Sequence, residues 1–324
     1  MKVLCVGRSE YNIFGEIDKY PEEGSLSNIT KITETSGGCT VNAAYTIGKY
    51  KIDTYVGSIV GDDTFGNSVR KELEKIGIHT EYMEIAYEKR TPISLILLNQ
   101  NTKTNTIFAL NKEKLLMKKT EFAMDPDLVL VDSSDYGAAL AALNKYSNKI
   151  TVIHATVPNS ETLELCKYVK YIICSKGFAS AASGVKIDFN NPNSLVNAYS
   201  ALLNKFPNRN IIVTLGEKGA MYTANNQIKV MPGLKVNAVD TTGAGDIFAG
   251  AFVYGILKDY DVEKCITFAN IASGLSVVKI GGKPSVPEYD EVMKYFNQKY
   301  APEENKQVVT PVIPTEAGQT TVKW

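Results

Sequence analysis

Short runs of aliphatic and β-branched residues alternate with helical stretches along most of this chain. Such alternation is typical of a mainly parallel β-sheet that carries helices on both faces. One helix is well marked, because Phe65, Val69, Leu73 and Ile76 recur at helical spacing and Gly77 follows the last turn. The predicted strands are residues 2–6, 55–60, 128–131, 151–154, 171–173 and 211–215. The fold class predicted from this pattern is α/β.

Two stretches fall outside this alternation. Residues 25–35 are polar and β-branched, and a polar segment, residues 99–104, joins two further strand-like runs within residues 93–110. We expect these stretches to form a small separate sheet that projects from the main body as a lid or an association surface. An extension of the edge of the main sheet is the alternative.

The charge balance excludes several classes of partner. The 324 residues contain 35 basic and 35 acidic side chains, so the chain has no global field to attract nucleic acid or an anionic membrane. The longest nearly apolar stretch, residues 244–257, contains Asp246 and is shorter than the roughly 20 residues that span a bilayer. We expect neither a membrane nor a nucleic-acid partner.

The cysteines and histidines give little material for a disulfide framework or a metal site. The five cysteines are dispersed without a C-x-x-C pair, which suits a reduced cytoplasmic compartment. His79 and His154 are the only histidines, and neither lies in a local cysteine or glutamate cluster. A zinc site or a histidine-based triad is therefore not expected.

The most informative segment is the turn Gly243-Ala244-Gly245, which leads directly into an apolar helix. Backbone amides at a helix N-terminus that carry no bulky side chains form an anion-binding nest. Asp246 is the only carboxylate of that helix, and its burial beside an anion hole suggests a general base. The alternative is a helix cap that favours the helix dipole.

The string Asp-Thr-Thr-Gly-Ala-Gly-Asp at residues 240–246 resembles the C-terminal signature of the ribokinase-like (PfkB) carbohydrate kinases. The resemblance implies a three-layer α/β/α domain with a small β-sheet lid. It also implies that Asp246 deprotonates a sugar hydroxyl while the amides of Gly243, Ala244 and Gly245 bind the transferring phosphoryl group.

A second signature supports the first. Gly37-Gly38, followed by Asn42, resembles the family's N-terminal signature, in which a glycine pair precedes a sugar-binding asparagine. The family usually has a sugar-gripping aspartate five residues past the glycine that matches Gly7, where this chain has Asn12. An amide there would favour a substrate that presents an acceptor or a negative charge. The alternative is that Asn12 accepts a hydrogen bond from one hydroxyl and the rest of the pocket compensates.

The nucleotide-binding segments match less completely. The resemblance places Thr214, Gly216 and Gly219 beside ATP, with Ser175 and Asn270 completing the ATP site. The family's usual Asn-x-x-Glu motif, which orders metal-bound water, is replaced by Ser-Lys-Gly-Phe at residues 175–178, as in ketohexokinase-like members. The way in which Mg²⁺ is held therefore stays open.

A last matching segment predicts a site for a monovalent cation such as K⁺. Oxygen-only ligation suits a hard cation, although a simple Gly-Pro-rich loop would also explain the residue pattern. The implied ligands are the side chains or carbonyls of Asp240, Thr242, Ser276, Lys279, Gly281 and Ser285.

Together these features predict a kinase domain over residues 1–300 and a C-terminal tail over residues 301–324. The predicted activity is ATP- and Mg²⁺-dependent phosphorylation of a hydroxymethyl group on a small sugar or sugar-like alcohol, by a homodimer paired through its lids. The sequence contains no Walker A string, so the glycine turn would hold the phosphates. A nucleoside kinase on the same fold and a catalytically silent sugar-binding homologue are the alternatives.

Overall fold

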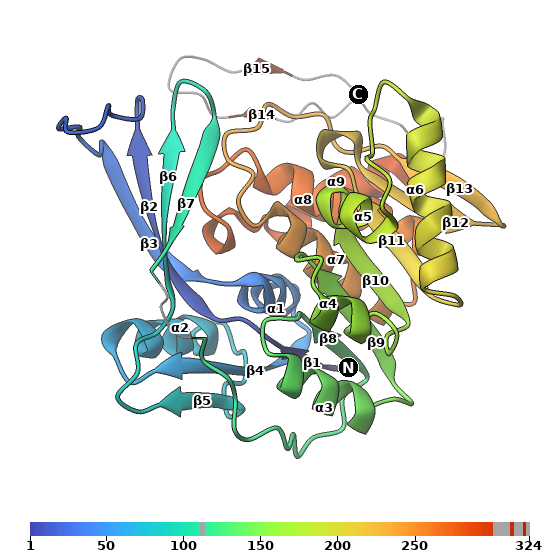
Figure 1. Ribbon diagram of the computed structural model, residues 1–324, viewed down its shortest axis with the longest axis horizontal. Coiled ribbons are helices and arrows are strands. Elements are labelled where there is room, and N and C mark those ends of the chain that lie inside the picture. The colour runs from blue at the N-terminus through green and yellow to red at the C-terminus, as the bar shows by residue number, and fades with distance from the viewer. Residues whose placement is uncertain (111–113, 301–311, 314–319, 322–324) are drawn as a thin grey trace.

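A nine-stranded sheet forms the centre of the protein (Figure 1). The computed structural model describes residues 1–110, 114–300, 312–313 and 320–321. The strand order is β13-β12-β11-β10-β9-β8-β1-β4-β5, and only the β11-β12-β13 pairings are antiparallel. The strands are β1 Lys2–Val6, β4 Asp53–Gly61, β5 Met83–Ala86, β8 Leu128–Val131, β9 Ile150–Ala155, β10 Tyr171–Ser175, β11 Asn210–Thr214, β12 Ala220–Ala224 and β13 Gln227–Met231. The predicted mainly parallel sheet is confirmed.

Helices cover both faces of this sheet. One face packs against α1 Cys39–Lys49, α2 Thr64–Glu74, α7 Ala244–Leu257, α8 Val262–Ser276 and α9 Tyr289–Tyr300. The other packs against α3 Tyr136–Lys145, α4 Ser160–Leu165, α5 Lys176–Ser183 and α6 Pro192–Lys205. The sequence of β1 is continuously apolar because both faces of the strand are buried. Val3 and Cys5 enter one core, and Leu4 and Val6 enter the other.

The helix predicted from the spacing of apolar residues is α2. Its N-cap is Asp63, whose carboxylate accepts a hydrogen bond of 2.8 Å from the amide of Gly66. The same carboxylate accepts hydrogen bonds from the amide and the hydroxyl of Thr91, at 2.8 and 2.6 Å. Asp63 therefore ties the start of α2 to the segment that leads into the small sheet.

A second sheet projects from the main body, as predicted, and is not an extension of the main sheet's edge (Figure 1). Its order is β3-β2-β6-β7, and we call it the lid; its strands are β2 Glu10–Ile17, β3 Lys31–Gly37, β6 Ile93–Asn99 and β7 Thr104–Ala109. The expected strand at residues 25–35 is misplaced, because residues 25–30 lie outside any strand. Strand β3 begins at Lys31, the partner of Glu16, and β2 ends one residue later, so earlier residues find no strand to pair with.

The remaining elements are short. The 3₁₀ helices are η1 Gly216–Lys218 and η2 Lys283–Ser285, and β14 Val312–Ile313 pairs with β15 Thr320–Thr321. Most of the predicted tail, residues 301–324, lies outside the described residues. Within the described part of the chain, every helix is too short or too polar to cross a membrane.

Candidate active site

Helix α7 begins in the glycine turn and places Asp246 in its first turn. Gly243 is the N-cap and adopts a left-handed conformation with φ of 76°. A Cβ at this position would lie 2.8 Å from Cα of Gly282, so only glycine fits both the conformation and the space. The turn thus presents bare backbone at a helix N-terminus, which is the geometry expected of an anion hole.

Asn42 of α1 and Asp246 of α7, the central residues of the two signatures, are in direct contact. The Asn42 Nδ2 donates a hydrogen bond of 2.8 Å to Oδ2 of Asp246. The contact depends on the close crossing of the two helices at Gly250, where a Cβ would lie 2.6 Å from the carbonyl oxygen of Ala43. The fold therefore assembles one site from the two signatures.

The environment of Asp246 favours a carboxylate that can take up a proton. Burial raises its pKa above the ordinary value for aspartate, although the nearby imidazole of His154 and the hydrogen bond from Asn42 oppose this rise. Only 9% of the residue is exposed. A buried carboxylate with a raised pKa beside an anion hole has the properties of a general base.

Two further side chains that sequence reasoning missed lie beside Asp246. The Nδ1 atom of His154, in β9, lies 3.4 Å from Oδ1 of Asp246, and Cys39 begins α1 on the same side. Neighbours in sequence gave no sign of this histidine–cysteine cluster, because Cys39 and His154 meet only through the fold. The one usable signal was the position of Cys39 directly after the glycine pair.

Asn12 lies directly against the glycine pair. Asn12 lies in β2 and is only 3% exposed. A Cβ at Gly37 would lie 2.0 Å from Nδ2 of Asn12, so this glycine makes room for the amide. Gly38, with φ of 97°, is the N-cap of α1. The predicted substrate residues thus lie together at the base of the lid.

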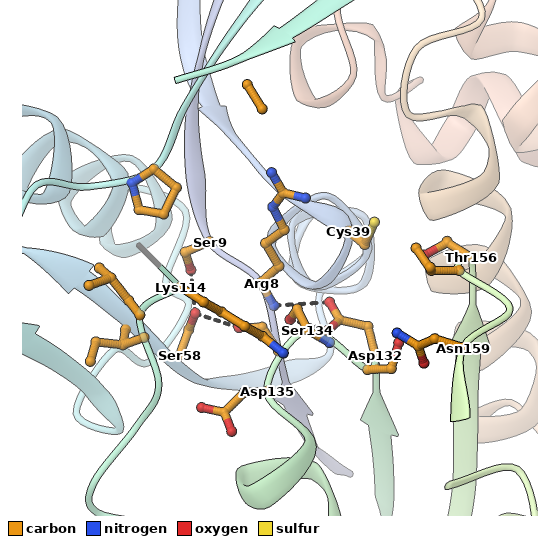
Figure 2. A pocket seen from close by; sticks show the side chains of 17 residues that line it. Arg8, Ser9, Cys39, Ser58, Lys114, Asp132, Ser134, Asp135, Thr156 and Asn159 are labelled. Carbon is orange, nitrogen blue, oxygen red and sulfur yellow. Dashed lines mark hydrogen bonds between the residues drawn. The ribbon is translucent and has the colours of Figure 1, made fainter. Parts of the chain in front are cut away.

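A cavity of about 530 Å³ opens at the carboxyl ends of β1, β8 and β9. Ligands of open α/β sheets bind at such a point, where the strand order changes direction. Figure 2 shows Arg8, Cys39, Lys114 and Asp132 among the side chains that line it. Asp132 accepts hydrogen bonds from the amide of Arg8 at 2.9 Å and from the Thr40 hydroxyl at 2.7 Å. Sequence reasoning singled out neither Arg8, Lys114 nor Asp132.

The predicted nucleotide residues gather at the ends of β10 and β11. Ser175 and Thr214 are partners in the register of these strands, and the Ser175 hydroxyl caps α5 by accepting a 3.1 Å hydrogen bond from the Phe178 amide. Gly216 and Gly219 both have positive φ, of 62° and 90°. Gly216 is the first residue of η1, the turn that follows β11, and Gly219 directly follows the end of that turn.

Asn270 connects this region to the loop that follows β13. Its Nδ2 atom donates hydrogen bonds of 3.2 and 3.1 Å to the carbonyl oxygens of Met231 and Pro232. In the same helix, the Ser273 hydroxyl donates to the carbonyl oxygen of Ala244 at 2.9 Å. Helix α8 therefore links the loop after β13 to the glycine turn.

The residues predicted to hold a monovalent cation come from two segments joined by Asp240. Its carboxylate accepts hydrogen bonds of 2.9 Å from the amides of Thr242 and Gly281. Within the second segment, the carbonyl oxygens of Ser276 and Gly281 accept from the amides of Lys279 and Ser285 at 3.1 and 3.0 Å, respectively. The donor set consists of oxygen atoms, which fits a hard cation such as K⁺.

Lys283, in η2, anchors the loop that carries the predicted cation ligands Gly281 and Ser285 to the base of the lid. Its ammonium group donates a hydrogen bond of 2.9 Å to the hydroxyl of Ser36, at the end of β3, and forms an ion pair with Glu72 of α2. Glu72 also accepts from the amide of Ser36 at 2.9 Å. The lid strand, α2 and the loop beside the anion hole are thus held at one point.

Residues 1–288 of this chain match the sequence pattern of the pfkB family of carbohydrate kinases. The chain belongs to the pfkB family. It is accordingly an ATP-dependent carbohydrate kinase, a phosphotransferase with an alcohol group as acceptor. This family membership confirms the resemblance of the two signatures.

Relatives along nearly the whole length support this assignment. The ribokinase of Staphylococcus aureus (strain COL) is 26% identical over 304 residues, which cover 90% of this chain and 98% of that protein. Other relatives include a deoxyribokinase and a nucleoside kinase, so the activity supported is phosphorylation of a sugar or a nucleoside.

Solved structures confirm the fold. A proposed ribokinase from Agrobacterium tumefaciens superposes with a TM-score of 0.84 at 24% identity, covering 93% of this chain and 99% of that one. Ribokinase from Arabidopsis thaliana, complexed with ribose and ATP, superposes with a TM-score of 0.73 at 22% identity, covering 91% and 98%. The ribokinase-like fold expected from the sequence is therefore present.

Proposed function

We propose that the protein transfers the γ-phosphoryl group of ATP to a hydroxymethyl group of a small sugar or sugar-like alcohol, with Asp246 as the general base. One observation carries this proposal. The side-chain oxygens Oδ1 of Asn12 and Oδ1 of Asn42 are buried, and neither has a hydrogen-bond partner within the described residues. Buried acceptors without donors are costly, and sugar hydroxyls beside Asp246 would supply the donors.

In this mechanism the protein acts mainly by positioning. Asp246 accepts the proton of the attacking hydroxyl through Oδ1, while Asn42 holds the other carboxylate oxygen in place. The amides at residues 243–245 bind the phosphoryl group as its negative charge develops, assisted by the N-terminus of α7. The Gly turn therefore replaces a Walker A loop.

Two ions complete the chemistry. Mg²⁺, bound with ATP, would neutralise charge on the phosphates. The segment around Asp240 would hold K⁺ against the back of the anion hole, through the donors Asp240, Thr242, Ser276, Lys279, Gly281 and Ser285. Ser175, Thr214, Gly216, Gly219 and Asn270 would contact the nucleotide from the ends of β10 and β11 and from α8.

The direct test is a phosphorylation screen over ketoses, aldoses, aminosugars, polyols and nucleosides with ATP and Mg²⁺. Product should form with at least one alcohol, and the Asp246→Asn variant serves as the matched inactive control. Equal product formation by the two proteins would exclude Asp246 as the base. A protein that binds a sugar without turnover would instead be the catalytically silent homologue.

A nucleoside is the second candidate acceptor. The cavity of about 530 Å³ is lined by residues that include Cys39 and Asn159, and ligand sites of this size accept molecules larger than a monosaccharide. A ribose 5′-hydroxyl could then reach Asp246 while the base occupies the rest of the cavity. A preference for nucleosides over free sugars in the screen would identify a nucleoside as the acceptor.

The lid is proposed to pair two chains into a homodimer. Ile32 on β3 and Ile107 and Phe108 on β7 expose 60%, 55% and 49% of their surface, respectively. Both strands are edges of the lid sheet, and such edges are normally protected. Light scattering should therefore give twice the monomer mass of 35.5 kDa, and a monomer mass at micromolar concentration would contradict the proposal.

A further inference from the structure

Cys39, His154 and Asp246 form a cluster of three different metal-binding groups. One ligand atom from each residue, the thiol sulfur, a ring nitrogen and a carboxylate oxygen, lies within 4.8 Å of the other two. The residues come from α1, β9 and α7, so elements of the rigid body of the fold, rather than a loop, hold them together.

The ring of His154 is oriented with one nitrogen toward this cluster. His154 is only 7% exposed, and its Nδ1 has no hydrogen-bond partner in the part of the chain that the structure describes. Its Nε2 faces the glycine turn, because a Cβ at Gly245 would lie 3.5 Å from that atom. A buried ring nitrogen that makes no hydrogen bond, and only a 3.4 Å contact with the Asp246 carboxylate, is poorly satisfied, and a bound ligand would satisfy it.

The distance between His154 and Asp246 suits a shared metal better than a hydrogen bond. Nδ1 of His154 lies 3.4 Å from Oδ1 of Asp246. Two ligands at about 2.1 Å from a tetrahedral zinc ion are separated by about 3.4 Å, which is the edge of the tetrahedron. Asn42 fixes the other carboxylate oxygen, so Oδ1 is the one presented to His154.

We propose that Cys39, His154 and Asp246 bind Zn²⁺. Thiolate, imidazole and carboxylate are the ligands of zinc, and three of them leave a fourth position for water. Cys39 lines the cavity at the ends of β1 and β8, which gives the ion a path of entry (Figure 2). On binding, the Zn–S bond replaces the S–H bond and the thiol proton leaves to solvent. Mg²⁺ does not compete, because it requires oxygen ligands.

The site makes zinc an inhibitor, a consequence that rests on the proposed function. Zn²⁺ on Oδ1 of Asp246 occupies the lone pair that would accept the proton of the sugar hydroxyl. The metal also brings positive charge and bulk to the place where the hydroxyl must approach. Zinc occupancy and turnover are therefore mutually exclusive.

The metal site is tested with Co²⁺, which replaces zinc and reports a thiolate ligand by its charge-transfer absorption. The full chain, stripped of metal, should bind one equivalent of Co²⁺ with this band, and Zn²⁺ should displace it. Cys39→Ser should lose the band, and His154→Gln should weaken metal binding at least tenfold, since even residues that only support a ligand contribute 10–100-fold.

Two variants serve as matched controls. His79→Gln removes the only other histidine, whose two nitrogens face different carboxylates, those of Asp53 and Glu81. Cys166→Ala removes a buried thiol from the opposite core. Both should keep the band. Absence of the band in the wild type, or its persistence in both Cys39→Ser and His154→Gln, would overturn the site.

The inhibitory role is measured separately, with free zinc fixed by a metal buffer and Mg²⁺ in excess. Each protein is compared with its own zinc-free rate, so a change in basal activity does not enter. Wild-type turnover should fall as zinc fills the site, while Cys39→Ser should keep its rate. Wild type that is saturated with zinc yet fully active would overturn inhibition. A cobalt band in a protein that phosphorylates no alcohol would leave the metal site standing and remove the proposed function.

Discussion

The amide of Asn42 and the carboxylate of Asp246 are joined by a 2.8 Å hydrogen bond across 204 residues of sequence. Asn42 lies in the first turn of α1, and Asp246 lies in the first turn of α7. The bond occupies Oδ2 of Asp246, so Oδ1 is the carboxylate oxygen left for the proposed acceptor alcohol. Substitutions at either end should therefore affect chemistry before they affect the fold.

Replacing Asp246 by Asn should lower turnover by about 100- to 10,000-fold, the range for loss of a general base. The variant should also unfold at a higher temperature near neutral pH. Because burial raises the pKa of Asp246, its stabilising contribution is present at low pH and is lost as pH rises through that raised pKa. A calorimetric scan and a coupled kinase assay measure the two effects, and retained turnover would identify Asp246 as a helix cap.

Gly250→Ala should reduce both stability and turnover. The added methyl group would meet the carbonyl oxygen of Ala43 and Cβ of Thr46, so α1 must move away from α7 and carry Asn42 with it. Overpacking of this kind costs about 1–3 kcal/mol. Gly255→Ala is the control, since its methyl group would press on Cys265 of α8 instead. Equal turnover in the two variants would show that the crossing of α1 and α7 at Gly250 does not affect catalysis.

Asn12→Asp should raise kcat/KM on plain neutral sugars such as fructose and ribose. A carboxylate accepts charge-assisted hydrogen bonds, which are roughly twice as strong as those to an amide. On the best substrate found in the screen, the same variant should lose activity if that substrate presents an acceptor or a negative charge to Asn12. Unchanged values on all three substrates would show that Asn12 does not set specificity.

K⁺ should activate the enzyme relative to tetramethylammonium at matched ionic strength. The oxygen donors around Asp240 lie on the loop that packs against the glycine turn, so a bound cation would stabilise the anion hole. Asp240→Asn should abolish the difference between the two salts. Identical wild-type rates in both salts would remove the cation from the mechanism.

Asp63→Ala should destabilise the protein by about 1 kcal/mol at pH 7, the usual effect of losing a helix cap. Burial alone would raise the pKa of Asp63, but the hydrogen bonds from Thr91 and Gly66 outweigh it and lower the pKa. The contribution is thus present above the ordinary aspartate pKa and is lost as pH falls through the lowered value. Urea unfolding of both proteins from pH 7 to pH 3 should show the difference shrinking; a constant difference would contradict this account.

Local patterns predicted six of the nine strands of the main sheet, because each of these six carries its own apolar run, whereas β5, β12 and β13 were not predicted. The run of four apolar residues at 128–131 is buried on both faces, and the predicted bounds agree with β8. The start of β3 could not be predicted, since it depends on where β2 ends as its partner. Strand β2 was missed for a related reason: Glu10, Asn12 and Glu16 interrupt its apolar residues.

The site could be predicted only where a motif keeps its residues together. Asp246 and the glycine turn are adjacent in sequence, so a short motif was enough to predict that they lie together. Cys39 and His154 have no common motif and meet because α7 packs against both α1 and β9. Arg8 and Lys114 reach the cavity from segments without a recognisable pattern, and no property of the sequence alone would have paired them.

The small sheet is built from strands that also carry Asn12 and Gly37, which are predicted to bind the sugar. Three residues join β1 to β2, which carries Asn12, and β3 runs directly into Gly37. A tilt of this sheet would therefore move the predicted substrate contacts of Asn12 and Gly37 together with the lid. In thermodynamic terms, acceptor binding and lid closure would be reciprocally linked. Binding would favour the closed lid by the same factor by which closure raises the affinity for the acceptor. Substitutions far out on β6 or β7 that alter this equilibrium will change acceptor affinity without touching the acceptor.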